Sequence, residues 1–162
     1  MKSRESRAES REPESFGSRL LASCANQFMS QANDICGTAF KNGAAILMAR
    51  LVDSAGATVR QSGLSAIEYS IYELDPCRPD SFAVVAGHDA VQLDVRDVIF
   101  NSLQTGGLWS VDAEGYNFRH EINAGRDAAF PMPGKCYQVR YELTPTTGRK
   151  TIVRFQLRTN EL

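Results

Sequence analysis

Apolar and polar residues alternate on both sides of a turn near the C-terminal end of the chain. The apolar positions before the turn are Tyr137, Val139, Tyr141 and Leu143, and those after it are Val153, Phe155 and Leu157. A period of two residues is typical of a half-buried antiparallel hairpin, because successive side chains of a strand point to opposite faces. We therefore predict that these side chains enter a core and that their polar neighbours face water.

The same alternation recurs along the preceding part of the chain. It predicts strands over 44–51, 65–74, 82–85, 91–95 and 116–122. Turn-forming residues at 53–56 and 112–115 separate some of these segments. Residues 75–81 are predicted to form a loop, because their two prolines cannot donate hydrogen bonds to a strand ladder.

The period changes once, after residue 95. The apolar residues there have the spacing of a helix: they are Val95, Val98, Ile99 and Leu103. This spacing predicts a short helix that ends before Gly106. Together these elements predict an all-β fold, an immunoglobulin-like antiparallel β-sandwich of about seven strands in two sheets, with one short inserted helix.

Two regions of different composition are expected. Residues 1–43 form a leader, in which 1–18 are rich in Arg, Glu and Ser and are expected to be disordered, and 20–35 could form a weak amphipathic helix. An over-long gene assignment, with Met29 as the true start, is an alternative. Residues 44–162 form the predicted sandwich domain.

Charge and hydropathy exclude some partners. The formal net charge of -1 gives no electrostatic attraction for nucleic acid. No apolar run reaches the roughly 18 residues that a membrane span requires, so no membrane partner is expected. Cys24 ends a lipobox-like segment, but the polar residues before it do not suit a signal peptide. We expect a cytoplasmic or virion-associated protein.

The cysteines and histidines do not have the spacing of a metal site. The four cysteines form no Cys-x-x-Cys pair, so neither a metal nor another cofactor is expected. Reduced thiols are the default expectation, although the sequence leaves a bridge between Cys77 and Cys136 open. His88 and Asp89, with Asp94 and Asp97 after them, offer ligands for a divalent cation, but their spacing matches no calcium loop, and a capping or solvated role is preferred.

The candidate ligand-binding residues are Trp109, Asp112, Tyr116 and His120, which lie close together in the sequence. If these side chains are exposed on one surface, they would form a binding site for a ligand such as a carbohydrate, with the aromatic rings available for stacking. A hydrolase that uses His120 with Glu121 or Asp112 is a more distant alternative. His120 also falls in the apolar register of its strand, where a structural role is preferred, and we expect no catalytic residue.

Three segments carry a resemblance to a known family. They are the strand and turn at 49–57, the Ile/Tyr strand at 65–72, and 137–145 with Gly148. This layout resembles the immunoglobulin-like modules of tailed-phage tail, baseplate and neck proteins and of prophage-derived bacterial proteins. The resemblance implies a structural virion component without catalysis. Its partners would be other protein subunits of an assembly, possibly further copies of itself, bound through sheet edges and loops.

Overall fold

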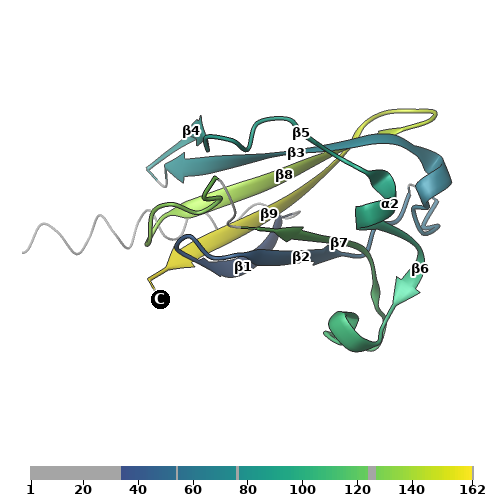
Figure 1. Ribbon diagram of the computed structural model, residues 1–162. Coiled ribbons are helices and arrows are strands. Elements are labelled where there is room, and N and C mark those ends of the chain that lie inside the picture. Colours follow the sequence, from purple (N-terminus) through teal and green to yellow (C-terminus); the bar gives the residue numbers. More distant parts are fainter. Residues whose placement is uncertain (1–33, 54, 76, 124–126, 162) are drawn as a thin grey trace, which may run out of the picture. The chain divides into compact units, whose positions relative to one another are not determined.

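The computed structural model describes residues 34–53, 55–75, 77–123 and 127–161, whose strands form two sheets (Figure 1). The predictions of a disordered segment and a weak helix in the leader fall mainly on residues 1–33, which lie outside the described residues. The described part contains one α-helix, α2 (Val95–Val98), and two short 3-10 helices, η2 (Gln61–Gly63) and η3 (Gly107–Trp109).

The larger sheet has six strands in the order β1-β9-β8-β3-β4, with β5 also paired to β3. Its members are β1 (Asp34–Phe40), β3 (Leu64–Asp75), β4 (Arg78–Val84), β5 (Val91–Leu93), β8 (Cys136–Pro145) and β9 (Thr151–Asn160). The smaller sheet has the order β2-β7-β6, formed by β2 (Ala45–Ala49), β6 (Ile99–Gln104) and β7 (Tyr116–Ile122).

This order confirms the prediction of an immunoglobulin-like sandwich. The three-stranded sheet corresponds to strands B, E and D of that fold, and β3, β8 and β9 correspond to C, F and G. One pairing departs from the expected antiparallel pattern, because β1 runs parallel to β9.

The alternating positions form the core between the sheets, as predicted. Tyr137, Val139, Tyr141 and Leu143 of β8 are all buried. Phe118 of β7 packs against them from the opposite sheet, with its ring centroid 4.8 Å from that of Tyr141. The two sheets are therefore joined by close contacts of large side chains, each of which removes apolar surface from water.

A tyrosine at the start of β8 closes the loop that precedes it. The hydroxyl of Tyr137 accepts a hydrogen bond from the backbone N–H of Met132, at 3.0 Å. Immunoglobulin-like sandwiches use a tyrosine in this way at the corner before strand F. The position two residues later carries a disulfide cysteine in antibody domains and is the buried Val139 here.

The larger sheet begins before the predicted domain boundary at residue 44. Strand β1 occupies 34–40, within the predicted leader, and pairs with β9 along its whole length. An ion pair of 2.7 Å between Asp34 and Arg154 Nε adds to the pairing. The strand has only a short alternating pattern of its own, so its place is set by the neighbour that it pairs with.

Two predicted elements differ from the structure. Strand β4 starts at Arg78, inside the predicted loop at 75–81, and includes Pro79. A proline is tolerated there because β4 lies at the edge of its sheet, where none of the described strands pairs with its outer side. The predicted helix ends at Val98, and its continuation to Leu103 is instead strand β6. Ile99 pairs with Phe118 of β7, so sheet pairing overrides the helical spacing.

Candidate functional site

The structure brings together two of the four predicted ligand-binding residues. Asp112 and Tyr116 lie at the β6–β7 turn, where the Tyr116 hydroxyl donates to Asp112 Oδ2 at 2.8 Å. Arg50 completes the group: its guanidinium lies 3.2 Å from Asp112 Oδ2 and 2.6 Å from Glu114, and it covers the Tyr116 ring.

The polar groups of this cluster bond mainly to one another. The other carboxylate oxygen of Asp112 accepts hydrogen bonds from the backbone N–H groups of Glu114 and Gly115, at 2.9 and 2.8 Å. These backbone hydrogen bonds, of which the one from Gly115 has the largest effect, lower the pKa of Asp112. The hydrogen bond from the Tyr116 hydroxyl and the positive charge of Arg50 lower it as well. The arrangement is that of a closed turn, in which Asp112 holds the backbone in place.

His120 lies apart from this cluster and packs in the core. Its Nδ1 lies 2.8 Å from the Tyr141 hydroxyl, and its ring is 5.1 Å from that of Tyr69. Burial lowers the pKa of His120 to about 4, against a smaller opposite effect of Glu121. At neutral pH the ring is therefore uncharged, and its position fits the structural role that we prefer for it.

A second histidine forms a buried chain that sequence reasoning missed. His88 is 5% exposed; the Tyr69 hydroxyl lies 3.1 Å from its Nδ1, and its Nε2 lies 3.1 Å from the carbonyl oxygen of Asp127. The partner Asp127 is 39 residues away along the chain, so no local motif could have shown the contact. Both ring nitrogens are bound, which leaves none for a metal.

The hydrolase alternative requires His120 to lie beside Glu121 or Asp112, and neither pair of side chains is in contact. Glu121 is exposed and follows His120 on the same strand, so the two side chains point to opposite faces of the smaller sheet. Asp112 is held by Arg50 and by its own turn. Asp94 caps α2 through a 2.9 Å bond from the N–H of Arg96, and Asp97 lies in the first turn, as preferred for both.

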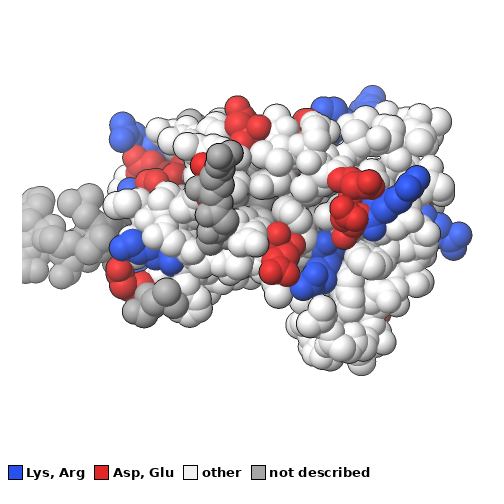
Figure 2. All heavy atoms as spheres, viewed as in Figure 1, with Lys and Arg blue, Asp and Glu red and all other residues white. Residues whose placement is uncertain are grey.

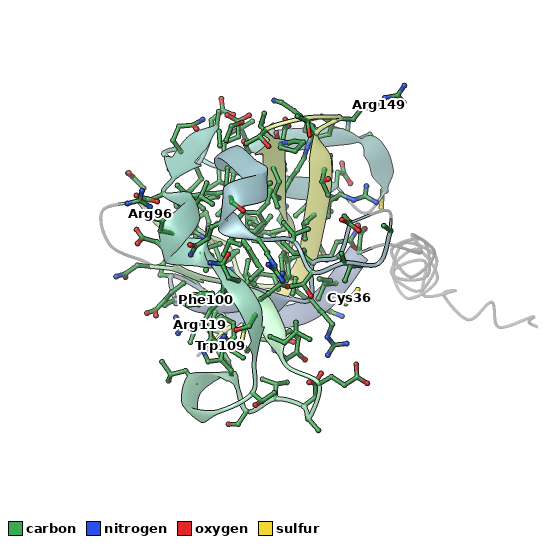
Figure 3. All side chains as sticks on the ribbon, turned by 90° about the vertical axis from the view of Figure 1, so that its right-hand side faces the viewer. Cys36, Arg96, Phe100, Trp109, Arg119 and Arg149 are labelled. Atoms are coloured by element: carbon green, nitrogen blue, oxygen red, sulfur yellow. The ribbon has the colours of Figure 1, made fainter. Side chains whose placement is uncertain are left out.

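Trp109 lies on a different surface from the other candidates. Its ring meets Phe100 edge to face, with centroids 4.7 Å apart, and it is partly exposed. Figure 3 shows Phe100 and Trp109 grouped with Arg119. Among the described residues the Trp109 ring contacts Phe100 and not Asp112, Tyr116 or His120, so the four predicted residues do not form one site.

An exposed apolar patch at the edge of the larger sheet was also missed. It consists of Tyr72 and Leu74 on β3 and Phe82 and Val84 on β4; Phe82 is 60% exposed and Val84 is 46% exposed. The β3–β4 register places Tyr72 opposite Val84 and Leu74 opposite Phe82, so all four share the outer face. The alternation of 82 and 84 with small residues signalled a strand, but only the topology shows that it is an edge.

The described part of the chain shows few features of a reactive centre. It contains no group of three or more His, Cys, Asp or Glu side chains that could hold a metal ion. Cys36 and Cys136 are free thiols, so no bridge joins Cys136 to Cys77. No helix within these residues is both long and apolar enough for a bilayer span.

Comparison of the chain with protein-family models and with curated proteins finds no match.

Proposed function

We propose that this domain is an assembly module that binds another protein chain by strand addition at β4. The observation that carries the proposal is the exposure of Phe82 and Val84 on a strand that, among the described strands, is paired on one side only. Exposed apolar side chains on an open edge are what a sheet-extending partner would cover. The domain acts in this view by holding another subunit in place, without catalysis.

The backbone of β4 presents its free hydrogen-bonding groups at these same residues. The N–H of Val85 donates to the carbonyl of Ile71 on β3, at 2.9 Å. Because the direction of backbone groups alternates along a strand, the N–H and C=O groups of Val84 and Phe82 face away from β3. A partner strand would therefore bond to the residues whose side chains are most exposed.

The outer-face patch would add apolar contact to the backbone bonds. The ring of Tyr72 meets Phe82 edge to face, with centroids 5.1 Å apart, and so holds it on the outer face. Pro79 limits the available edge to the second half of β4, because proline carries no N–H. The expected partner segment is therefore short, extended and apolar at alternate positions.

Site-specific photo-cross-linking in the cells that make the protein tests this proposal. A photo-reactive phenylalanine analogue at position 82 should capture one defined protein. The same analogue at Ile152, which is exposed on β9, should not. Val84→Pro should abolish capture at position 82, because it removes an outward N–H while the β3 ladder stays intact. Equal capture with Val84→Pro contradicts strand addition.

A virion-like particle is the assembly that the resemblance to phage modules supports. This part of the proposal rests on the pattern at 49–57, 65–72 and 137–145. Genes for portal, capsid or tail proteins beside the gene for this chain would support it. A neighbourhood without them, together with a captured partner of another class, would contradict it.

A second candidate function is ligand binding at Trp109, and the partial exposure of its ring beside Phe100 favours it. Sugars and other planar ligands stack on such rings. Trp109 is the only tryptophan of the chain, so its fluorescence reports this surface alone. Titration with a panel of oligosaccharides should shift the emission if this function holds, and Asp112 and His120 variants should leave that shift unchanged.

A further inference from the structure

The segment between β6 and β7 carries an uncharged apolar protrusion. No charged residue occurs between Asp97 and Asp112. Leu108 is 73% exposed and Val111 is 64% exposed, both beside Trp109 in η3. The segment extends below the smaller sheet in Figure 1, and the same region is almost entirely white in Figure 2. Exposed apolar residues gathered in this way mark an interaction surface.

An uncharged groove lies at the open seam between the two sheets. Edge strands β1 and β2 form most of its lining, and its volume is about 380 Å³. Apart from Val111, its exposed apolar residues are Ile35, Phe40 and Ile46, each 41% to 50% exposed. None of the described residues that line it is charged, and the buried Phe155 and Leu157 form part of its floor.

We propose that a second copy of this chain fills this groove with its own protrusion, 103–111, in a two-fold symmetric dimer. The two surfaces match in charge, because both are free of ionised groups and neither leaves a charge unpaired on contact. They are also adjacent, since Val111 belongs to the protrusion and lines the groove. Because the two surfaces are adjacent, the protrusion of each copy can enter the groove of the other at the same time, and the assembly is then complete with two chains.

The residues that border the protrusion favour a protein surface over a lipid one. Loops that insert into membranes are commonly flanked by basic residues that meet anionic headgroups. Here the bordering charges are of both signs: Asp97 follows Arg96, and the carboxylates of Asp112 and Glu114 are both ion-paired with Arg50, so the border carries no excess of positive charge. Such a border disfavours an anionic bilayer, whereas it leaves the contact between two uncharged protein surfaces unaffected.

The first test is the mass of the full chain by size-exclusion chromatography with light scattering, over about a hundredfold range of concentration. The wild-type chain should pass from monomer to dimer. Leu108→Asp on the protrusion and Ile46→Asp at the groove should each weaken dimerisation by roughly tenfold or more, because each places a charge in an apolar contact. Both side chains are largely exposed in the monomer, so the fold should persist.

Phe82→Asp is the matched control, because Phe82 is also exposed and apolar but lies on β4. It should leave this dimer unchanged while it weakens capture of the partner proposed above, so the two proposals fail separately. A chain that is monomeric throughout, or a dimer that only Phe82→Asp disrupts, overturns the inference. Leu108-dependent binding to phosphatidylcholine vesicles overturns it too, because lipid would then be the occupant.

The free thiol of Cys36 allows a second test that does not depend on dimer strength. Cys36 is exposed and lines the groove. A short bis-maleimide should join a cysteine introduced by Leu108→Cys in one chain to Cys36 of another, and peptide mass spectrometry should identify the link. Leu108→Cys combined with Cys36→Ser should lose this link. Absence of the link in a dimeric sample overturns the proposed geometry.

Discussion

The side chain of Asn117 and the backbone of Leu51 exchange two hydrogen bonds inside the sandwich. The N–H of Leu51 donates to Asn117 Oδ1 at 2.6 Å, and Asn117 Nδ2 donates back to the Leu51 carbonyl at 3.0 Å. A further bond of 3.0 Å reaches the carbonyl of Val59. The side chain thus continues the pairing of β2 and β7 beyond the last β2 residue, Ala49, and ties down both sides of the 51–59 turn.

Asn117→Ala should therefore lower the free energy of unfolding by about 2–4 kcal/mol, because it leaves several buried backbone groups without partners. Asn160→Ala is the matched control, since Asn160 is exposed and its side chain makes no hydrogen bond to the described residues. That change should stay within about 0.5 kcal/mol. Urea unfolding followed by circular dichroism measures both. Similar values for the two variants would show that the buried bonds contribute little.

Tyr137→Phe tests the closure of the loop before β8. Without the hydroxyl, the Met132 N–H loses its partner, and we expect a loss of about 1 kcal/mol. Tyr72→Phe removes a hydroxyl that makes no hydrogen bond to the described residues and should be close to neutral. Equilibrium denaturation at neutral pH gives both values. A neutral Tyr137→Phe variant would mean that water replaces the lost contact without cost.

Stability should fall on acidification through His120. Burial lowers the pKa of its ring from 6.5 to about 4, so between these values the unfolded chain binds more protons than the folded one. The contribution is fully present above pH 6.5 and is lost as the pH falls toward 4. Because the ring is only partly buried, we expect a loss of about 1–3 kcal/mol over this window.

The variant His120→Gln isolates this effect from the titration of carboxyl groups. It lacks the imidazole, so its unfolding free energy should fall less between pH 7 and pH 4.5 than that of the wild-type chain. Denaturant titrations at several pH values in this interval measure the difference. Parallel curves for the two proteins would show that His120 does not carry the acid sensitivity.

Two glycines with positive φ should respond differently to substitution. Gly115 has a φ of 82°, and an added Cβ would lie 2.5 Å from the carbonyl oxygen of Gln104. Gly148 has a φ of 98°, and an added Cβ would meet nothing within 4 Å. We expect Gly148→Ala to cost about 1 kcal/mol from backbone strain and Gly115→Ala to cost at least about 1–2 kcal/mol more from the clash. Thermal unfolding of both variants gives the comparison, and equal costs would contradict the role of the close approach.

Much of the core could be predicted from the sequence, because each long strand carries its own signal. In β8 from Tyr137 to Leu143 and in β9 from Val153 to Leu157 every second side chain is apolar, and this period decides which face is buried whichever strands lie beside it. The turn at 112–115 was predictable for the same local reason, since Asp112 bonds to N–H groups two and three residues ahead.

Tertiary structure decided the secondary structure of segments that form strands only because another strand pairs with them. Strand β1 exists because β9 is there to pair with it, and residues 99–104 form a strand because Ile99 meets Phe118. The candidate site has the same limit. Closeness in sequence suggested that Trp109, Asp112, Tyr116 and His120 act together. In the structure only Asp112 and Tyr116 meet, whereas Trp109 contacts Phe100, and His120, four residues farther along β7, contacts Tyr141 of the other sheet.

The sequence by itself therefore determined the fold class and the buried face of each long strand, because these follow from periodicity within a segment. Only the tertiary structure decided which strands lie at an edge and which apolar side chains remain exposed. Phe82 and Leu108 are chemically like the residues of the core, and they are exposed because none of the described segments covers them. Coverage depends on the packing of distant segments, which no local pattern contains.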